Sequence, residues 1–396
     1  MTATFVSPAK VDEARLNEAM GWFARAHGRR HDPGMAPLDD ASWRTVAFTH
    51  KPDLRSVPHP YPETGRWIRS LHSSGTTAEP VFSPWSQVDQ QIADTAAREI
   101  HARCPLIQGA RCAVIAPGPP LAVAHFMLRE IELSGGLAWL VEPGEPERIW
   151  RTLMDNGIEV VFTLPLVASR LVEYFQATRR RSPAGVSVVF CAGDVLSPAR
   201  QSMLAAMWEA RVLNMFGCSE LFGPLAGPGE GGHPLVWRCE PVAVEVINPA
   251  SMSPCRVGER GVLVLTTLWP KARPLQRYWT DDTVEVTQTA SVDGVFGFHY
   301  IGRPSSVLTT QYGQVALRDI DDLLLGSGVC GLEWLVHQNP EGLCVRSEML
   351  TRAAGAVRQL TEALTETLGG PVEFVPQEPG SLPRATPKFC VATTAI

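Results

Sequence analysis

The clearest pattern along the chain is a series of short, wholly apolar runs separated by amphipathic stretches. The apolar runs fall at 111–116, 137–142, 158–164, 186–191 and 211–216. The stretches with helical spacing fall between them, at 121–133, 145–155, 166–178 and 197–209. Strands that are apolar on both faces are typical of a parallel sheet covered by helices on both sides. The pattern therefore predicts an α/β fold with a doubly wound sheet.

Two helices and a loop region are expected before this alternation. Residues 11–27 carry apolar side chains at helical spacing, namely Leu16, Met20 and Phe23. Ser86 and Asp89 form a capping box at the start of another helix. The apolar stripe of that helix would be Val88, Ile92, Ala96 and Ile100. Residues 28–70 are rich in Pro, His and Arg and are expected to run as surface loops.

The rhythm changes after residue 240. Alternating patterns predict further strands at 242–247, 261–268, 283–288 and 295–301. These strands are typical of an antiparallel, β-rich section that follows the α/β core. Beyond Gly302–Arg303 a compact α+β piece is expected, with helices near 318–325 and 350–368 and strands near 332–338, 342–347 and 372–375.

Composition narrows the class of protein. The chain has 396 residues, of which 45% are hydrophobic and 19% charged, which describes a globular protein of two or three domains. A net charge of −6 argues against a nucleic-acid partner. The longest apolar stretch, 112–128, is interrupted by three prolines, so no membrane span is expected. Nine scattered cysteines without a CxxC pair, and no readable secretory signal, favour a cytoplasmic protein with free thiols.

One loop carries candidate phosphate chemistry. Ser73, Ser74, Gly75, Thr76 and Thr77 place four hydroxyls around a glycine. Hydroxyls and inward-pointing N–H groups can wrap a polyphosphate, and glycine lets the backbone approach closely. A plain Ser/Thr turn is the alternative interpretation of this segment.

The same loop resembles the SSGTTGKP signature of the adenylate-forming superfamily. The resemblance implies that the loop clamps the β- and γ-phosphates of ATP and that Thr76 takes part in catalysis. Ala78-Glu79 stands where the family usually has Gly-Lys. A positive charge that would face the leaving pyrophosphate is therefore absent from the loop.

Two further segments resemble the family's nucleotide motifs. Ala192, Gly193 and Asp194 follow a predicted strand and are similar to the turn that contacts adenine, although an ordinary strand-to-helix turn is the alternative. The segment 214–220 resembles the YGxTE motif. There Phe216 would stack on adenine and Glu220 would bind Mg²⁺, for which carboxylate oxygen is suitable. Asn214, Gly217 and Ser219 would complete this nucleotide site. A surface acid is the alternative for Glu220.

A third segment, Arg277-Tyr278-Trp279-Thr280-Asp281-Asp282, resembles RYRTGD. The resemblance implies that Asp282 accepts hydrogen bonds from both ribose hydroxyls, and a polar hairpin turn is the alternative. Asp281 replaces the family's glycine. Two further runs, 49–54 and 263–275, are similar to the phenylacetate–CoA ligase branch, so the resemblance spans nearly the whole chain.

The C-terminal part resembles the family's small mobile domain. Gly302-Arg303 matches the family's hinge, which implies a large domain at 1–303, a small domain at 304–396 and a ribose contact from Arg303. Pro304 follows where the family has aspartate and restricts rotation. Lys388 matches the lysine that enters the active site for adenylation, and an exposed tail lysine is the alternative.

Candidates for the acid pocket come from the resemblance as well. They are His125, Phe126, Phe162 and Leu164, and simple core residues are the alternative. Some relatives carry zinc near residues 220–255. The spacing of the residues available here, Cys218, His233, Cys239 and Cys255, matches no standard zinc pattern.

Together these features predict an enzyme that uses ATP and Mg²⁺ to activate a carboxylic acid, expected to be aromatic, as an acyl-adenylate. The acyl group would then pass to a thiol, with CoA or another pantetheine favoured. A carrier protein, a protein cysteine and an amine are alternative acceptors. A homodimer and a degenerate, non-catalytic nucleotide-binding protein are left open.

Overall fold

The structure is a computed structural model. It describes residues 13–26, 40–55, 67–72, 81–102, 108–117, 122–221, 223–229, 235–237, 241–288, 296–339, 342–351 and 355–383. The chain forms two compact units. The first consists of Met1–Pro143, Ile158–Phe162 and Asn214–Tyr300, and the second of Gly144–Gly157, Thr163–Leu213 and Ile301–Ile396. The boundary expected between residues 303 and 304 stays a prediction.

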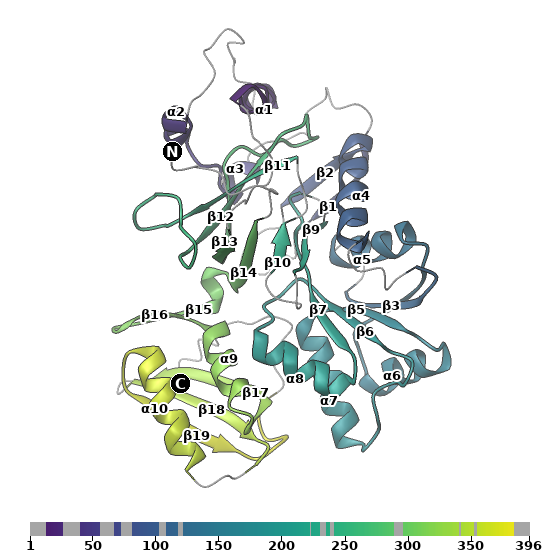
Figure 1. Cartoon of the computed structure of the whole chain (residues 1–396), viewed down its shortest axis with the longest axis vertical. Coiled ribbons are helices and arrows are strands. Elements are labelled where there is room, and N and C mark those ends of the chain that lie inside the picture. The colour runs from purple at the N-terminus through teal and green to yellow at the C-terminus, as the bar shows by residue number, and fades with distance from the viewer. Residues whose placement is uncertain are drawn as a thin grey trace. The chain divides into compact units, whose positions relative to one another are not determined.

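A seven-stranded sheet is the centre of the first unit, with the strand order β11-β12-β13-β14-β10-β9-β8 among the described residues. Its strands are β8 (Phe216–Cys218), β9 (Gly223–Pro228), β10 (Leu235–Trp237), β11 (Val242–Ile247), β12 (Arg260–Thr267), β13 (Tyr278–Gln288) and β14 (Gly297–Gly302). Antiparallel pairing joins β11 to β12, β12 to β13, and β10 to both β9 and β14. Figure 1 shows β12, β13 and β14 side by side. The β-rich section expected after residue 240 is confirmed.

Two helices and two strand pairs complete the main body of this unit. They are β1 (Trp67–His72), β2 (Phe82–Ser86), α4 (Gln87–Ala102), β3 (Arg111–Ile115), α5 (Ala122–Leu133) and β4 (Leu137–Val141). The strands β1 and β2 pair antiparallel, whereas β3 and β4 pair in parallel. Helix α4 packs against β9, where a Cβ added to Gly227 would lie 2.8 Å from Cγ2 of Ile100. Glycine is therefore what allows this close approach of helix and strand.

The capping box that begins α4 is confirmed. Asp89 Oδ2 accepts hydrogen bonds from Ser86 N at 2.9 Å and from Ser86 Oγ at 3.0 Å, while Asp89 N donates back to Ser86 Oγ at 3.2 Å. The expected apolar stripe is wrong at one position, because Val88 in the first turn is 41% exposed. The buried face of α4 runs instead through Ala93, Ala96, Ala97 and Ile100.

The expectation of surface loops over residues 28–70 is wrong at 40–45, 51–55 and 67–70, while 28–39 and 56–66 lie outside the described residues. Helix α2 (Asp40–Thr45), helix α3 (Lys51–Arg55) and the start of β1 all fall in that range. Trp43 of α2 is fully buried in an apolar cluster with residues of α1 (Glu13–Ala26), which confirms the first helix. Helices of five or six residues are too short to show an amphipathic period, so only tertiary burial defines them.

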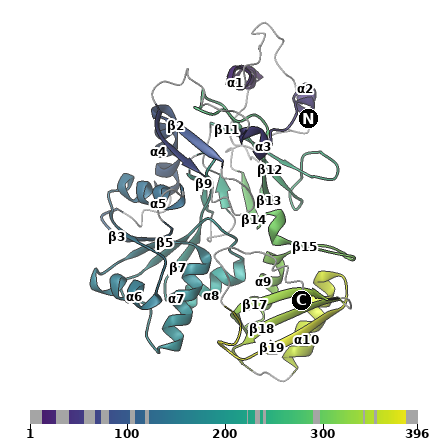
Figure 2. The same ribbon diagram turned by 180° about the vertical axis from the view of Figure 1, so that it is seen from behind.

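A five-stranded sheet has the order β4-β3-β5-β6-β7. The remaining strands are β5 (Val160–Thr163), β6 (Val188–Cys191) and β7 (Arg211–Asn214), and every residue of β5 and β6 is buried. The intervening helices are α6 (Pro146–Asp155), α7 (Pro165–Ala177) and α8 (Pro198–Trp208). Each begins with proline, whose fixed φ suits the first helical position. Figure 2 shows α7 beside α8. The predicted α/β alternation is confirmed.

The C-terminal residues of the second unit form an α+β arrangement, as predicted. Its elements are η3 (Pro304–Ser306), β15 (Val307–Thr310), β16 (Gly313–Ala316), α9 (Leu317–Gly326), β17 (Cys330–Asn339), β18 (Gly342–Met349), α10 (Ala356–Leu368) and β19 (Val372–Gln377). Strand β18 pairs antiparallel with β17 and parallel with β19. The hairpin of β15 and β16 was not expected, and α10 begins six residues later than predicted, after Gly355 at φ 81°. Over the described residues, no helix is long and apolar enough to cross a membrane.

Candidate active site

Three of the residues singled out by the sequence gather in the first unit. Phe216 lies on β8, Glu220 in the turn that follows, and Asp282 on β13. The Phe216 ring centroid is 5.4 Å from that of Tyr300 on β14. The Tyr300 hydroxyl donates a hydrogen bond to Asp282 Oδ1 at 2.9 Å. Strands that are distant in sequence therefore place an aromatic ring, a phenol and a carboxylate in one row.

Asp282 is almost fully buried, and its local backbone is unusual. Its N–H donates to Thr280 Oγ1 at 3.0 Å. The neighbouring Asp281 has φ 65°, in the left-handed region that glycine favours and that Asp tolerates better than most residues. The replacement of the family's glycine by Asp281 is therefore accommodated. The hairpin-turn alternative is wrong, because both aspartates lie within β13 and not between strands.

Glu220 is a buried carboxylate, so the surface-acid alternative is also wrong. Its Oε1 accepts a hydrogen bond from the Tyr278 hydroxyl at 3.1 Å and lies 3.9 Å from the ammonium of Lys51. Its Oε2 accepts from Ser219 Oγ at 3.2 Å. Burial, and next to it the charge of Glu220, raise the pKa of Tyr278 well above its ordinary value. Tyr278 is consequently a neutral hydrogen-bond donor at physiological pH.

Glu220 offers carboxylate oxygen, the kind of ligand that Mg²⁺ prefers. Magnesium in phosphate-binding enzymes is commonly held by one or two carboxylates together with substrate phosphates and water. Glu220 fits the role of a single carboxylate ligand. No cluster of three or more His, Cys, Asp or Glu suited to a metal occurs among the residues that the structure describes. A zinc site stays untested, because His233 and Cys239 lie outside them.

The turn after β6 and the segment before η3 belong to the second unit. Ala192 N donates to Thr163 O at 3.0 Å, Gly193 has φ 85°, and Asp194 Oδ1 accepts from Val195 N at 2.8 Å. Ser306 N donates to Arg303 O at 2.7 Å, which closes the turn of η3. Both predicted segments therefore form tight turns whose backbone N–H and C=O groups take part in hydrogen bonds.

The remaining nucleotide candidates divide into two groups. Asn214 is half-buried at the end of β7. Gly217 is required by packing, since a Cβ there would lie 2.1 Å from the carbonyl oxygen of Gly223. The phosphate-loop residues Ser73, Ser74, Gly75, Thr76 and Thr77 and the lysine Lys388 lie outside the described residues.

The four acid-pocket candidates occupy different places. Phe126 on α5 stacks on Trp85 at 5.5 Å between centroids and packs against the cluster that contains Phe216. Phe162 is fully buried, 6.3 Å from the ring of His101. Leu164 precedes α7 in the second unit. Among the four candidates, Phe126 is the one that packs against the apolar cluster containing Phe216.

His125, next to Phe126, faces the cation Arg69. Its ring contacts the Arg69 guanidinium. Burial first, and then the charge of Arg69, lower the pKa of His125. His125 is therefore neutral at physiological pH and offers a ring nitrogen for hydrogen bonding.

Sequence reasoning missed three members of this cluster as site residues: Lys51, Tyr278 and Tyr300. Tyr278 and Lys51 lie inside runs that resemble the family, which is the signal that could have found them. Tyr300 lies in an ordinary strand pattern and has no such signal. Its role follows only from the distance to Asp282.

The sequence is similar to those of known acid–CoA ligases. A phenylacetate–coenzyme A ligase of Thermus thermophilus is 30% identical over 287 residues, which cover 66% of this chain and 60% of the relative. A propionate–CoA ligase of Escherichia coli is 23% identical over 333 residues, covering 75% of this chain and 52% of the relative. No protein-family profile matches the sequence. The sequence is thus similar to the phenylacetate–CoA ligases among the adenylate-forming enzymes.

Solved structures agree with this assignment at the level of fold. A 2-hydroxyisobutyryl-CoA ligase in complex with 2-HIB-AMP has a TM-score of 0.79 at 18% identity, covering 94% of this chain and 86% of that one. An anthranilate CoA ligase in complex with anthranoyl-AMP has a TM-score of 0.60 at 15% identity, covering 80% and 64%. The adenylate-forming fold is thus confirmed. The chain spans 60% and 52% of the length of the two relatives named above.

Proposed function

We propose that this phenylacetate–CoA ligase-like protein uses ATP to activate a carboxylic acid as an acyl-adenylate and passes the acyl group to the thiol of coenzyme A. The observation that carries the proposal is the row formed by Phe216, Tyr300 and Asp282 beside buried Glu220. This row offers a flat apolar surface, a neutral phenol and an acceptor-only carboxylate. These are the groups that an adenosine moiety needs for stacking and for its ribose hydroxyls.

In the proposed complex, Phe216 supports the adenine ring and Asp282 accepts hydrogen bonds from the ribose. Tyr300 donates to one oxygen of Asp282, which fixes the orientation of the carboxylate. A carboxylate accepts hydrogen bonds at both of its oxygens, so Asp282 is chemically suited to ribose hydroxyls. Because Asp282 is buried, this bonding is shielded from competing water.

Glu220 would hold Mg²⁺, and the ion would neutralise negative charge on the phosphates of ATP. Tyr278 and Ser219 each donate to one Glu220 oxygen and thereby orient the carboxylate. The ammonium of Lys51 lies 3.9 Å from Oε1 and adds a positive charge beside the carboxylate. Polar donors around a buried carboxylate are a way to preorganise it before ligand binding.

The proposal assigns the other motif residues by the family resemblance. The segment 73–77 would hold the β- and γ-phosphates, with Thr76 near the reacting phosphate. Lys388 would stabilise the charge that develops at the α-phosphate. The turn of Ala192, Gly193 and Asp194 would contact adenine, together with Asn214, and Arg303 would contact the ribose.

An aromatic acid is the proposed substrate class. Its support is Phe126, a partly buried ring that stacks on the buried Trp85 and packs against the cluster that contains Phe216. The name of the Thermus relative, phenylacetate–coenzyme A ligase, agrees with this choice. His125 and Phe162 are the other pocket residues proposed in the first unit, and Leu164 is a candidate by the family resemblance alone.

The acceptor is proposed to be CoA, because both relatives named above are CoA ligases. Transfer to a carrier-protein pantetheine or a protein cysteine would use the same adenylate. An amine is the second candidate acceptor, since an amide bond synthetase of Marinactinospora thermotolerans shares the fold with a TM-score of 0.56 at 18% identity. A non-catalytic nucleotide-binding protein is the contrasting candidate.

The test is acid-dependent exchange of pyrophosphate into ATP, measured with phenylacetate, benzoate, anthranilate and propionate. Asp282→Asn should raise the KM for ATP roughly 10- to 100-fold, since hydrogen bonds to charged groups contribute about 1.5–3 kcal/mol. Tyr300→Phe should raise it roughly 2- to 10-fold, because one neutral donor is lost. Glu285→Gln on the same strand, 29% exposed, is the matched control and should leave it unchanged.

Two outcomes separate the candidates. If none of the acids supports exchange although ATP binds and Asp282→Asn weakens that binding, the protein is a non-catalytic nucleotide binder. If exchange occurs, product analysis with CoA or with an amine identifies the acceptor.

A further inference from the structure

The loop between β12 and β13 contains a fully buried lysine. Lys271 is 0% exposed, and its Nζ has no hydrogen-bond partner among the described residues. Lysine is almost never fully buried without a partner, because burying an ammonium removes its hydration. A buried polar group of this kind needs an explanation, and a ligand that supplies the missing acceptors is one.

Asp89 is one carboxylate that acts on this ammonium, but its oxygens are occupied. Asp89 Oδ1 accepts from Trp269 Nε1 at 2.8 Å. Asp89 Oδ2 accepts from Ala272 N at 3.2 Å and from both donors of Ser86. Asp89 therefore anchors the loop and the start of α4 and forms no ion pair with Lys271.

Glu220 is the other carboxylate that acts on Lys271, and it is engaged as well. Its oxygens accept from Tyr278 and Ser219, and its Oε1 lies 3.9 Å from the ammonium of Lys51. Attraction from Glu220 nevertheless acts on the Lys271 ammonium. Trp269, two residues before Lys271, packs in the same apolar cluster as Phe216 and Tyr278, so the loop of Lys271 borders the proposed active site.

The loop holds Lys271 in a fixed place. Lys271 N donates to Trp269 O at 2.7 Å, and the residues on both sides, Trp269 and Ala272, are tied to Asp89. Arg273 Nη1 donates to the carbonyl oxygen of Phe82 at 2.5 Å. Only the side chain of Lys271 is left to adjust, and its four-carbon stem is flexible. A rigid backbone with an adjustable ammonium suits a ligand-binding residue.

We propose that Lys271 is an oxyanion-binding residue of the active site, whose ammonium receives a carboxylate or phosphate oxygen of the ligand beside Glu220. This inference rests on the proposed function. The two sources of the oxyanion are the acid substrate and the nucleotide, and the experiment below distinguishes them. Attraction to an arriving anion is stronger in this buried setting than at the surface.

The electrostatic surroundings of Lys271 are consistent with this role. Burial is the main cause that lowers the pKa of Lys271, and the charge of Arg273 lowers it further. The charges of Asp89, Cys218 and Glu220 act in the opposite direction and raise it. An anion placed at Nζ would offset the burial effect and favour the protonated form. Ligand binding and the charge on Lys271 are therefore expected to support each other.

The experiment compares the wild-type protein with Lys271→Met, a substitution that keeps the length of the side chain and removes its charge. Thermal unfolding is measured alone and with phenylacetate, with the neutral phenylacetamide, and with pyrophosphate. Pyrophosphate exchange then gives the KM for the acid and for ATP. Arg260→Met, which removes a partly exposed charge from β12, is the control.

The expected result is a Lys271→Met protein that unfolds at the same or a higher temperature than wild type, since an unpaired buried charge has been removed. Its stabilisation by the anionic ligand should be lost, and one KM should rise on the order of 10- to 100-fold. A change in the acid KM with phenylacetate stabilisation lost identifies the carboxylate. A change in the ATP KM with pyrophosphate stabilisation lost identifies the phosphate.

The proposal is overturned if Lys271→Met unfolds at a lower temperature while both KM values stay at wild-type level, which would show a structural lysine. Lys271→Gln serves if the methionine variant does not fold, because it is neutral but still polar. If wild type shows no exchange with any acid, the proposed function fails. The ligand-induced stabilisation by pyrophosphate still tests Lys271 in that case.

Discussion

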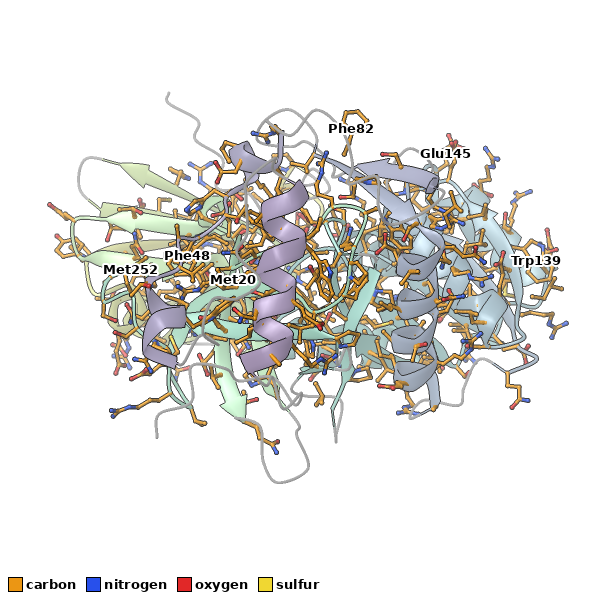
Figure 3. All side chains as sticks on the ribbon, turned by 90° about the horizontal axis from the view of Figure 1, so that it is seen from above. Met20, Phe48, Phe82, Trp139, Glu145 and Met252 are labelled. Atoms are coloured by element: carbon orange, nitrogen blue, oxygen red, sulfur yellow. The ribbon has the colours of Figure 1, made fainter. Side chains whose placement is uncertain are left out.

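Arg277 should be among the most stability-sensitive residues of the first unit. Its guanidinium forms a bidentate ion pair with Glu245, with Nη2–Oε1 at 2.9 Å and Nε–Oε2 at 3.1 Å. Both side chains are buried, at 3% and 1% exposure. The other terminal nitrogen of Arg277, Nη1, donates to three carbonyl oxygens, those of Trp43, Arg44 and Val46. The ring of Phe48, which Figure 3 labels, lies 4.1 Å from its Cζ.

The size of the effect follows from what Arg277→Met leaves behind. Removal of one partner from a buried ion pair costs about 3–5 kcal/mol, because the other charge stays buried without compensation. For a unit of 150–250 residues, 1 kcal/mol corresponds to roughly 2–4 °C in Tm. Arg277→Met should therefore lower the Tm of the first unit by roughly 6–20 °C.

Thermal unfolding followed by tryptophan fluorescence is a suitable assay, because Trp43 is fully buried beside Arg277. Arg260→Met is the matched control on the neighbouring strand. Its ion pair with Glu285 has 39% and 29% exposure and should contribute about 0–1 kcal/mol. The double variant Arg277→Met/Glu245→Leu should recover part of the loss, and the three carbonyl acceptors should account for the rest.

Equal Tm values for Arg277→Met and Arg260→Met would refute this reasoning. Such a result would mean that Glu245 finds other donors or water once Arg277 is gone. Failure of the double variant to regain any stability would locate the loss in the carbonyl contacts and not in the charge pair.

Three further predictions concern other parts of the chain. Arg200→Met should destabilise the second unit by about 3–5 kcal/mol, because it leaves the buried Asp321 carboxylate without its cation. A loss of unfolding free energy below about 1 kcal/mol, measured by denaturant unfolding, would contradict this. Lys388→Ala should slow pyrophosphate exchange but spare thioester formation from supplied acyl-adenylate, and an unchanged exchange rate would remove that assignment. Burial lowers the pKa of Lys271 in the folded protein below the ordinary 10.5. Between these two pKa values the unfolded chain binds more protons than the folded protein, so the stability of the wild type rises with pH. Any Tm advantage of Lys271→Met over wild type should therefore shrink with rising pH, and a pH-independent difference would count against it.

Strong hydrophobic patterns predicted the fold well where each element carries its own signal. The strands β5 and β6 are apolar throughout, and helices such as α7 begin with a proline that defines their first turn. Short elements were missed, because α2 and α3 have too few residues to show a period. The start of β13 was also missed, because the predicted strand began only at residue 283. The polar residues before it are typical of a turn, and Arg277 and Asp281 do have the positive φ common in turns. Pairing with β12 decides its conformation instead.

The candidate site was predictable only as far as its motifs reach. Phe216, Glu220 and Asp282 were found because their segments resemble known motifs. Their hydrogen-bond donors, Tyr278 and Tyr300, come from other strands of the sheet, and no local pattern marks them as partners. Which donor meets which carboxylate depends on strand register, and register is a property of the folded sheet.

The buried cations of the structure give the strongest reason to look for a ligand at Lys271. Arg277 and Arg200 show how this chain stabilises a buried cation, because each forms a bidentate pair with a carboxylate and adds a backbone carbonyl. Lys271 is buried as fully as either, yet the carboxylates that act on it are held by other donors. A folded core could replace such a lysine with methionine at no loss of stability. Its presence beside Glu220 is therefore better explained by binding than by folding, and the ligand is expected to supply the oxygen acceptors that the protein does not.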